Sequence, residues 1–279
     1  MAAGLALGAA LVGGSVGVSR IVLPGAIEGP EAEALPRVPA LPVIPAHFEG
    51  VPLATYLGPP ALRSAHMDEL LASPVLGDVE FTRAVQGWLT YWTVYATRWF
   101  PGFLDRMAMR GNAVDEALAH HGFPPSLRYL PLIESGYDPR VTSRSGAVGM
   151  WQLMPSTARG LGLTVDPLLD ERRDVEKSTE AALRYLASLN AEFDSWFLTL
   201  AAYNSGPTRV RGILRRHAPG EPPTDSLFWA LRDRFALETR EFMPKLYGAM
   251  FVASRPEGYG YESTDGEPFA FRTVSAAAP

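Results

Sequence analysis

Residues 130–163 read LPLIESGYDPRVTSRSGAVGMWQLMPSTARGLGL, and the rest of the chain can be interpreted outward from them. The stretch begins as an apolar segment, carries one carboxylate at Glu134, and breaks at Gly136 and Pro139. A Ser- and Gly-rich loop follows, and a helix is expected to restart after Pro155. Burial disfavours the charged form of a carboxyl group, so a Glu at the end of an apolar helix can keep its proton at neutral pH. The stretch therefore predicts a general acid, Glu134, that faces a polar loop.

The segments on either side of this stretch have helical patterns. Apolar residues recur at helical spacing from Val79 onward, and caps such as Gly122 and Asp174 mark helix ends. Helices are expected over residues 101–121, 174–193, 195–206 and 207–217, around residue 228, and over residues 238–251. No alternation typical of strands occurs before about Gly258. The predicted fold class is all-α.

Four aromatic residues, Trp88, Trp92, Tyr95 and Trp99, recur at a spacing that places them on one stripe of a helix. Such a stripe can stack on sugar rings. Aromatic stripes more often pack in a protein core, and we favour that interpretation here.

Composition excludes several kinds of site. The net charge is −5 with no basic cluster, which argues against nucleic-acid binding. The chain has no Cys, which excludes disulfides, thiolate metal sites, Cys nucleophiles and a lipidated N-terminal Cys. The five His show no HExxH spacing, so we expect neither a metal nor another cofactor.

The chain divides into four expected segments. Residues 1–23 are predicted to be a signal peptide or membrane anchor, because residues 2–19 are uncharged and rich in Ala, Gly, Leu and Val. A tail of small residues without structure is the alternative. Residues 24–77 read as a Pro-rich linker, or as a segment with no spacer role. A catalytic domain is expected over residues 78–255, and a loose C-terminal tail over residues 256–279.

Neutral hydrogen-bonding residues accompany the single acid. Ser135, Ser143, Gln152, Tyr203 and Asn204 are all predicted to lie in turns or at helix ends. A polar, uncharged site with one acid and nearby aromatics suits a carbohydrate, which offers hydroxyls, amides and an apolar ring face. Cleaving a glycosidic bond needs a proton on the leaving oxygen, and a Glu with a raised pKa supplies it. These residues alone do not establish a site that cleaves glycosidic bonds, because a lone Glu before Gly is most often a solvated helix end.

Four motifs strengthen it: IESGYDP, SRSGAVGMWQLMPSTA, DERRDVEKSTEAALRYL and LAAYNSGPTRV, with LETREFMPKL as a weaker fifth. In this order they resemble the catalytic domain of the family 1 lytic transglycosylases (the SLT domain), in the branch of membrane-bound lytic murein transglycosylase D. The resemblance covers roughly Val79 to Ser254. One motif alone would be weak evidence, but four at compatible spacing are specific.

The resemblance implies a lysozyme-like helical domain, similar to goose-type lysozyme, that cleaves the MurNAc–GlcNAc β-1,4 bond of peptidoglycan without water. In such enzymes the Glu that corresponds to Glu134 acts first as general acid. As a carboxylate it then takes the proton of the MurNAc C6 hydroxyl, which closes on C1 and leaves a 1,6-anhydro end. The family has no second catalytic carboxylate, and the chain shows no obvious partner acid for Glu134.

Carried over position by position, the resemblance assigns substrate-binding roles to Ser143, Gln152, Met154, Tyr203, Asn204 and Glu238. Ser143 would orient the catalytic or N-acetyl region, Tyr203 would hydrogen-bond near Glu134, and Glu238 would bind sugar or brace the cleft. Asn204 could instead be a helix cap and Met154 a core residue. Phe242 stands where the family usually has Tyr, which would remove one hydroxyl from the cleft.

Two alternative functions stay open: a goose-type lysozyme-like muramidase, which is a hydrolase, and a glycan-binding protein without activity. The expected partner is the peptidoglycan glycan strand, with no nucleic acid, with membrane association at the N-terminus as an option, and with a monomeric state. The expected location is the periplasm or cell envelope. The sequence does not distinguish endo- from exo-lytic cleavage.

Overall fold

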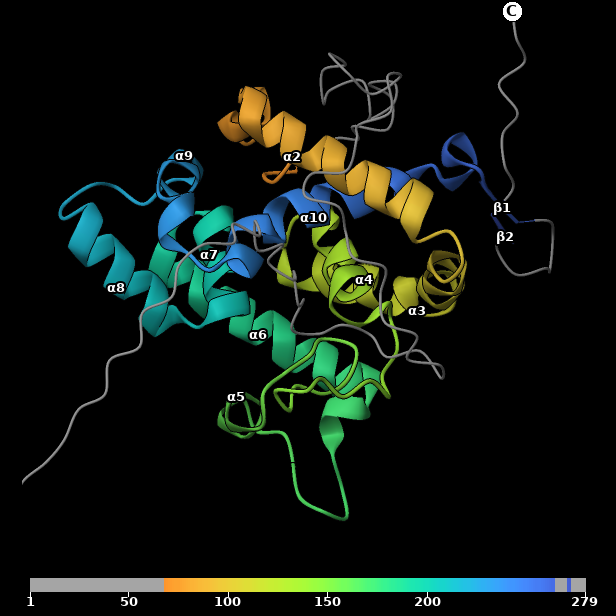
Figure 1. Ribbon diagram of the computed structural model, residues 1–279. Coiled ribbons are helices and arrows are strands. Elements are labelled where there is room, and N and C mark those ends of the chain that lie inside the picture. Colours follow the sequence, from red (N-terminus) through yellow and green to blue (C-terminus); the bar gives the residue numbers. More distant parts are fainter. Residues whose placement is uncertain (1–67, 264–269, 272–279) are drawn as a thin grey trace, which may run out of the picture.

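The computed structural model describes residues 68–263 and 270–271 (Figure 1). Its helices are α2 (Val79–Thr90), α3 (Phe100–His121), α4 (Leu130–Ser135), α5 (Pro155–Gly160), α6 (Val175–Phe193), α7 (Trp196–Ser205), α8 (Pro207–His217), α9 (Asp225–Ala230) and α10 (Leu237–Ser254). Short 3-10 helices cover Pro74–Gly77, Pro125–Tyr129, Glu171–Arg173, Arg232–Arg234 and Pro256–Tyr259. The strands β1 (Tyr261–Glu262) and β2 (Ala270–Phe271) form one short antiparallel pair. The prediction of an all-α fold is confirmed.

Helix α10 lies at the centre of the fold and packs against α2, α7 and α4 (Figure 1). Its middle is buried from Phe242 to Ala253 except at Lys245. Gly248 allows α2 to approach closely, because a Cβ at this position would lie 2.7 Å from Cβ of Trp88. The contact brings α2 and α10 together close to the residues that form the candidate site.

The helix ends follow the local signals in the sequence. Gly122 ends α3 in the left-handed conformation, with φ 68°. Asp174 caps α6 by accepting a hydrogen bond from the Lys177 amide at 2.9 Å, and Ser195 caps α7. One face of α6 is buried, at Thr179, Ala182, Leu183, Leu186, Leu189 and Phe193.

The aromatic stripe does not lie on one α-helix. Helix α2 ends at Thr90, and Tyr91–Tyr95 form a π-helical turn that shifts the helical register. Trp88 and Trp92 are buried, whereas Tyr95 and Trp99 are only partly buried against the core. The core interpretation is therefore confirmed for the first two residues, and the single stripe is wrong.

The packed unit is larger than the predicted domain of residues 78–255. Leu70 and Val75, which the prediction assigned to the Pro-rich linker, belong to the core. Tyr261, which the prediction placed in a loose tail, is fully buried and its hydroxyl donates to the carbonyl of Trp92. The core residues of these two segments escaped prediction because each segment has only a few apolar residues among many Pro, Gly and other turn-forming residues.

The expected leader or anchor at residues 1–23 and most of the expected linker lie outside the described residues. Among helices in the described part of the chain, none is long and apolar enough to cross a membrane.

Candidate active site

Glu134 lies in the last turn of α4, a helix of only six residues. Gly136 ends the helix in the left-handed conformation, with φ 59°. No other residue fits at this position, because a Cβ would lie 2.4 Å from the Phe103 ring of α3. The neighbours Ile133 and Ser135 are buried, whereas Glu134 is partly exposed. The local fold therefore directs this one carboxyl group out of an otherwise buried helix.

Two side chains from other helices and one from α4 itself fix the end of α4. Arg106 of α3 donates to the carbonyl oxygen of Gly136 at 2.7 Å. Ser135 donates to the carbonyl oxygen of Met150 at 2.8 Å, which ties α4 to the polar loop. Lys245 of α10 donates from Nζ to the carbonyl oxygen of Ile133 at 2.8 Å. The backbone that carries Glu134 is thus held from several directions.

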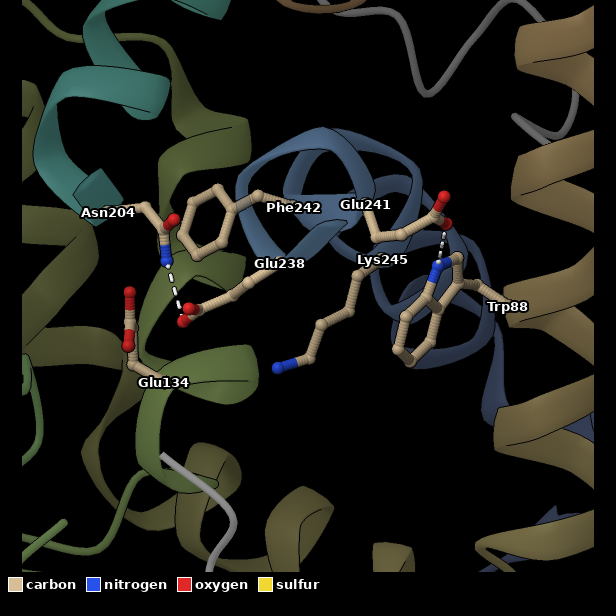
Figure 2. Close-up of a pocket in the computed structure, with 7 residues that line it drawn as sticks. All are labelled: Trp88, Glu134, Asn204, Glu238, Glu241, Phe242 and Lys245. Carbon is tan, nitrogen blue, oxygen red and sulfur yellow. Dashed lines mark hydrogen bonds between the residues drawn. The ribbon is translucent and has the colours of Figure 1, made fainter. Parts of the chain in front are cut away.

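Glu134 lines a pocket together with side chains from three other helices. The lining residues are Trp88 from α2, Asn204 from α7, and Glu238, Glu241, Phe242 and Lys245 from α10. Figure 2 shows the carboxylates of Glu134 and Glu238 on the same side of the pocket, with the Lys245 side chain extending toward them. The structure thus brings Glu134, Asn204 and Glu238 together in one pocket, and their catalytic and substrate-binding roles stay predictions.

The environment of Glu134 favours its protonated form. Burial raises its pKa to about 7, Lys245 opposes the rise, and the nearby Glu238 adds to it. The raised pKa that we expected from the apolar helix is confirmed. A carboxyl group with a pKa near neutrality can both give and take a proton at physiological pH.

Glu238 is a second carboxyl group in the same pocket. Asn204 donates from Nδ2 to Oε1 of Glu238 at 3.2 Å, and Thr239 donates to Oδ1 of Asn204 at 2.8 Å. Burial raises the pKa of Glu238, while the hydrogen bond from Asn204 and the charges of Lys245 and Arg209 lower it. Helix α10 thus brings a second carboxyl group, far from Glu134 in the sequence, into the pocket, and the expected role of Glu238 in binding sugar or bracing the cleft stays a prediction.

The other predicted site residues build the neighbouring loop and do not line this pocket. Ser143 is buried and its Oγ accepts a hydrogen bond from the Ala147 amide at 2.9 Å. Gln152 has a φ of 50° and donates to the carbonyl oxygen of Gly149 at 2.8 Å. Their substrate-binding roles stay predictions.

Tyr203 lies on α7 and reaches the loop with its hydroxyl, whereas Met154 lies at the end of the loop, directly before α5. The Tyr203 hydroxyl donates to the carbonyl oxygen of Trp151 at 2.6 Å, and the charge of Glu134 contributes to raising the pKa of Tyr203, although burial raises it most. Tyr203 thus lies near Glu134 but hydrogen-bonds the loop. Met154 is 41% exposed, so the alternative that it is a core residue is wrong.

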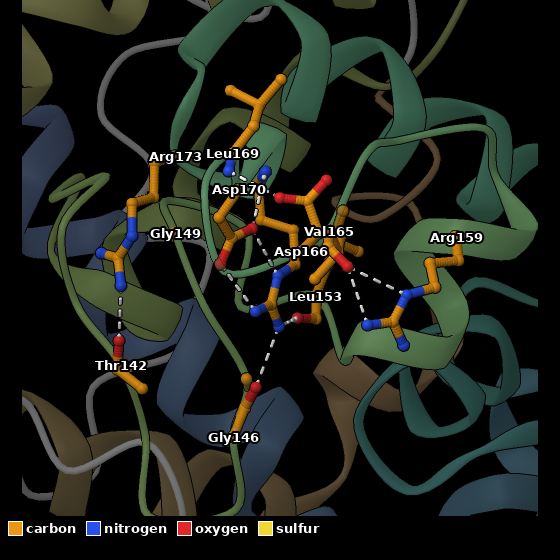
Figure 3. Close-up of polar contacts among 12 residues, drawn as sticks. Thr142, Gly146, Gly149, Leu153, Arg159, Val165, Asp166, Leu169, Asp170 and Arg173 are labelled. Carbon is orange, nitrogen blue, oxygen red and sulfur yellow. Dashed lines mark hydrogen bonds and ion pairs between the residues drawn. The ribbon is translucent and has the colours of Figure 1, made fainter.

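Arg172 holds the loop by hydrogen bonds, and Figure 3 labels its partners Asp170, Gly146 and Leu153. Its guanidinium binds both carboxylate oxygens of Asp170, at 2.8 and 2.7 Å, and Nη1 donates to the carbonyl oxygens of Gly146 and Leu153 at 2.9 and 3.0 Å. Gly149, with φ 85°, passes so close that a Cβ would lie 1.9 Å from the carbonyl oxygen of Arg172. The charged run at residues 170–174 therefore forms a salt-bridged corner that is hydrogen-bonded to the loop backbone.

Sequence reasoning missed Trp88, Glu241 and Lys245. Trp88 donates from Nε1 to Oε2 of Glu241 at 3.0 Å. Lys245 is a lone cation between buried residues of α10, and that isolation was a usable signal. Phe242 forms part of the wall with its ring, so no hydroxyl is present at this point of the pocket.

A known protein family matches the part of the chain that carries Glu134. Residues 113–221 match the transglycosylase SLT domain. The chain contains a transglycosylase SLT domain. This SLT domain includes Glu134 and Asn204, but Trp88 precedes the matched residues, and Glu238 and Lys245 follow them. The pocket is thus assembled from the SLT domain and from helices on both sides of it.

Two relatives illustrate the similarity of the SLT domain. Membrane-bound lytic murein transglycosylase D of Escherichia coli strain K12 is 39% identical over 158 residues, which are 56% of this chain and 34% of that protein. Endo-type membrane-bound lytic murein transglycosylase A of Klebsiella pneumoniae is 36% identical over 98 residues, 33% of this chain and 48% of that protein. The chain spans between a third and a half of the length of these relatives.

Two solved structures are similar to this chain. An inactive mutant of lytic transglycosylase Slt from Pseudomonas aeruginosa superposes with a TM-score of 0.44 at 16% identity, covering 78% of this chain and 39% of that one. The 70 kDa soluble lytic transglycosylase of Escherichia coli gives a TM-score of 0.44 at 20% identity, with 78% and 38% covered.

Proposed function

We propose that this protein is a peptidoglycan lytic transglycosylase that cleaves the MurNAc–GlcNAc β-1,4 bond and leaves 1,6-anhydroMurNAc ends. One observation carries the proposal: Glu134, in the SLT domain, has a pKa of about 7 in a pocket whose other polar groups come from α7 and α10. The names of the similar proteins support the same reaction and substrate.

The proposed reaction uses Glu134 twice. The protonated carboxyl group gives its proton to the glycosidic oxygen while the bond from MurNAc C1 to that oxygen breaks. Glu134 is then a carboxylate, and it takes the proton of the MurNAc C6 hydroxyl as this oxygen forms a bond to C1. No water is consumed, and Glu134 returns to its protonated state. A pKa near 7 suits both halves of this cycle.

A muramidase is the second candidate, because Glu238 shares the pocket and a second carboxylate could activate a water molecule. Glu238 accepts a hydrogen bond from Asn204 at 3.2 Å, and the names of the similar proteins favour the internal C6 hydroxyl as the nucleophile.

The proposal extends to location and partners. A wall-cleaving enzyme meets peptidoglycan strands in the periplasm or cell envelope, and the uncharged segment at residues 2–19 would serve for export or anchoring. We propose that Ser143, Gln152, Met154, Tyr203 and Asn204 contact the glycan strand or shape the loop against which it lies. We also propose that the enzyme acts as a monomer.

Mass spectrometry of digested peptidoglycan tests the proposal. The wild-type protein should release anhydro-muropeptides, whereas reducing-end muropeptides would show that it is a muramidase. Glu134→Gln should lower the rate by roughly 10²–10⁴-fold, the range typical of a lost general acid or base. Glu221→Gln, which changes an exposed Glu outside the pocket, is the matched control and should leave the rate unchanged. An unchanged rate in Glu134→Gln would remove Glu134 from its assigned role.

A further inference from the structure

Lys245 is a half-buried cation that the reaction described above does not use. It lies on α10 between the buried residues Pro244 and Leu246, yet its side chain reaches the Glu134 pocket. Burying an ammonium group is costly unless it is paired, so its retention here calls for a reason.

The contacts of Lys245 leave most of its hydrogen-bonding capacity free. Nζ carries three protons, and one is donated to the carbonyl oxygen of Ile133, the residue before Glu134. Among the described residues, Nζ makes no other hydrogen bond and no ion pair within 4.0 Å. The other two protons of Nζ have no hydrogen-bond acceptor among the described residues. The Lys245 side chain lines the same pocket as Glu134 and Glu238 (Figure 2).

The charges around Lys245 come from several elements. Glu134 on α4 and Glu238 on α10 both act on it electrostatically, and Glu241 lines the same pocket. From α8, Arg209 acts on Glu238, and from α7, Tyr203 feels the charge of Glu134. Among these groups, Lys245 is the cation that lines the pocket with Glu134.

We propose that Lys245 is a positioning residue that fixes the backbone of Glu134 through the Ile133 carbonyl and supplies the counter-charge for the Glu134 carboxylate in the second half of the reaction. This inference rests on the proposed function. While Glu134 is protonated, no ion pair is needed, and none within 4.0 Å is present in the described residues. After Glu134 gives up its proton, the ammonium stabilises the resulting carboxylate until the proton of the C6 hydroxyl is taken.

Two effects of Lys245 can be separated by substitution. Lys245→Gln can still donate to the Ile133 carbonyl but has no charge, whereas Lys245→Arg keeps the charge. Because the ammonium lowers the pKa of Glu134, its loss should move the loss of activity on the alkaline side to higher pH. A purely structural role would lower the rate without moving this limb.

The experiment measures kcat/KM against pH for the full chain, with purified peptidoglycan as substrate. Lys245→Gln should lower the maximal rate at least 10-fold and move the alkaline limb upward by about 1 pH unit or more. Lys245→Arg should keep the limb at the wild-type position. Lys177→Gln, which removes an exposed lysine paired with Glu171, is the control and should change neither quantity.

Infrared titration of the Glu134 carboxyl group, identified by its absence in Glu134→Gln, gives a readout that needs no activity. The pH at which it ionises should rise in Lys245→Gln and stay in place in Lys245→Arg. An unmoved titration in folded Lys245→Gln would overturn the inference, and so would a titration displaced in Lys245→Arg if Lys245→Gln did not fold. Wild-type protein that releases no anhydro-muropeptides would instead contradict the proposed function, while the titration would still report on Lys245.

Discussion

Arg172 is a buried cation and Lys245 is a half-buried one, and they differ in how completely their charges and protons are paired. Arg172, 5% exposed, has its charge matched by both oxygens of Asp170 and donates to two loop carbonyls. Lys245 makes one hydrogen bond, and its acidic neighbours in the pocket are not ion-paired with it within the described part of the chain. Figure 2 shows the Lys245 side chain in the pocket, and Figure 3 labels Asp170, Gly146 and Leu153, the partners of Arg172.

The difference separates charges that build the fold from charges that are available for chemistry. A buried ion with all its partners in place resists any change of protonation, because each change would break several contacts. Asp170 follows this pattern, since its hydrogen bonds to Arg172 lower its pKa. Glu134 shows the reverse: burial raises its pKa, and the protein leaves the proton easy to exchange near neutrality.

The largest expected effect comes from removing Arg172, the cation whose partners are all in place. Arg172→Met should lower the free energy of unfolding by about 3–5 kcal/mol, because it leaves the Asp170 carboxylate and two loop carbonyls without their donor. Urea unfolding followed by circular dichroism measures the loss. Arg173→Met, at an exposed neighbour, is the control, and equal losses in the two variants would contradict the role given to Arg172.

Two glycines of the loop, Gly146 and Gly149, test how closely the loop packs against the backbone of Arg172. Gly149→Ala should destabilise the protein by about 1–3 kcal/mol more than Gly146→Ala. Both glycines have positive φ, but only at Gly149 would the added Cβ meet an atom, the carbonyl oxygen of Arg172 at 1.9 Å. Thermal unfolding of the two variants tests this, and equal stabilities would show that the loop can move away from Arg172.

On the chemical side, Glu134→Gln should stabilise the protein at alkaline pH. The pKa of Glu134 is raised from 4.5 to about 7, so the folded state holds the proton more tightly than the unfolded state. The cost of ionising Glu134 is absent below about pH 4, grows as the pH rises, and is complete above about pH 7. The variant should therefore gain roughly 1–3 kcal/mol at pH 8 and nothing at pH 4. Urea unfolding at several pH values tests it; a gain independent of pH would argue against burial as the cause.

The smallest expected effect concerns the far wall of the pocket. Trp88→Phe removes the hydrogen bond to Glu241 and should cost about 1 kcal/mol in the free energy of unfolding. The loss is limited because Glu241 is partly exposed and keeps Arg240, with Nε 3.5 Å from its Oε1. Differential scanning calorimetry can resolve it, and a loss of several kcal/mol would mean that Glu241 depends on Trp88 alone.

The sequence predicted the helices well because their signals are local. Gly122, Asp174 and Ser195 each end or begin a helix through contacts within a few residues. The π-helical turn at Tyr91–Tyr95 escaped prediction, since periodicity assumes a constant helical repeat. The place of Tyr261 in the core also escaped, because its contact with Trp92 joins distant parts of the chain.

The candidate site was predictable to the extent that it follows motifs. Glu134 and Asn204 lie in short recognisable stretches, and the structure brings both to one pocket, while their roles stay predictions. Lys245 was not found, because its significance depends on which helix end its ammonium reaches. Ser143 and Gln152 carry hydroxyl and amide groups that suit a glycan, yet in this structure they hydrogen-bond the loop backbone.

Helix α10 carries the electrostatic setting of Glu134 on a segment that follows residue 221, where the match to the SLT domain ends. The acid and the α10 groups that act on its pKa therefore lie on opposite sides of the end of the matched region. Substitutions at Glu238 or Lys245 would change the pKa of Glu134 while every motif around the acid stays unchanged. A fragment trimmed to residues 113–221 would keep Glu134 but lose the surroundings that give it a proton to donate.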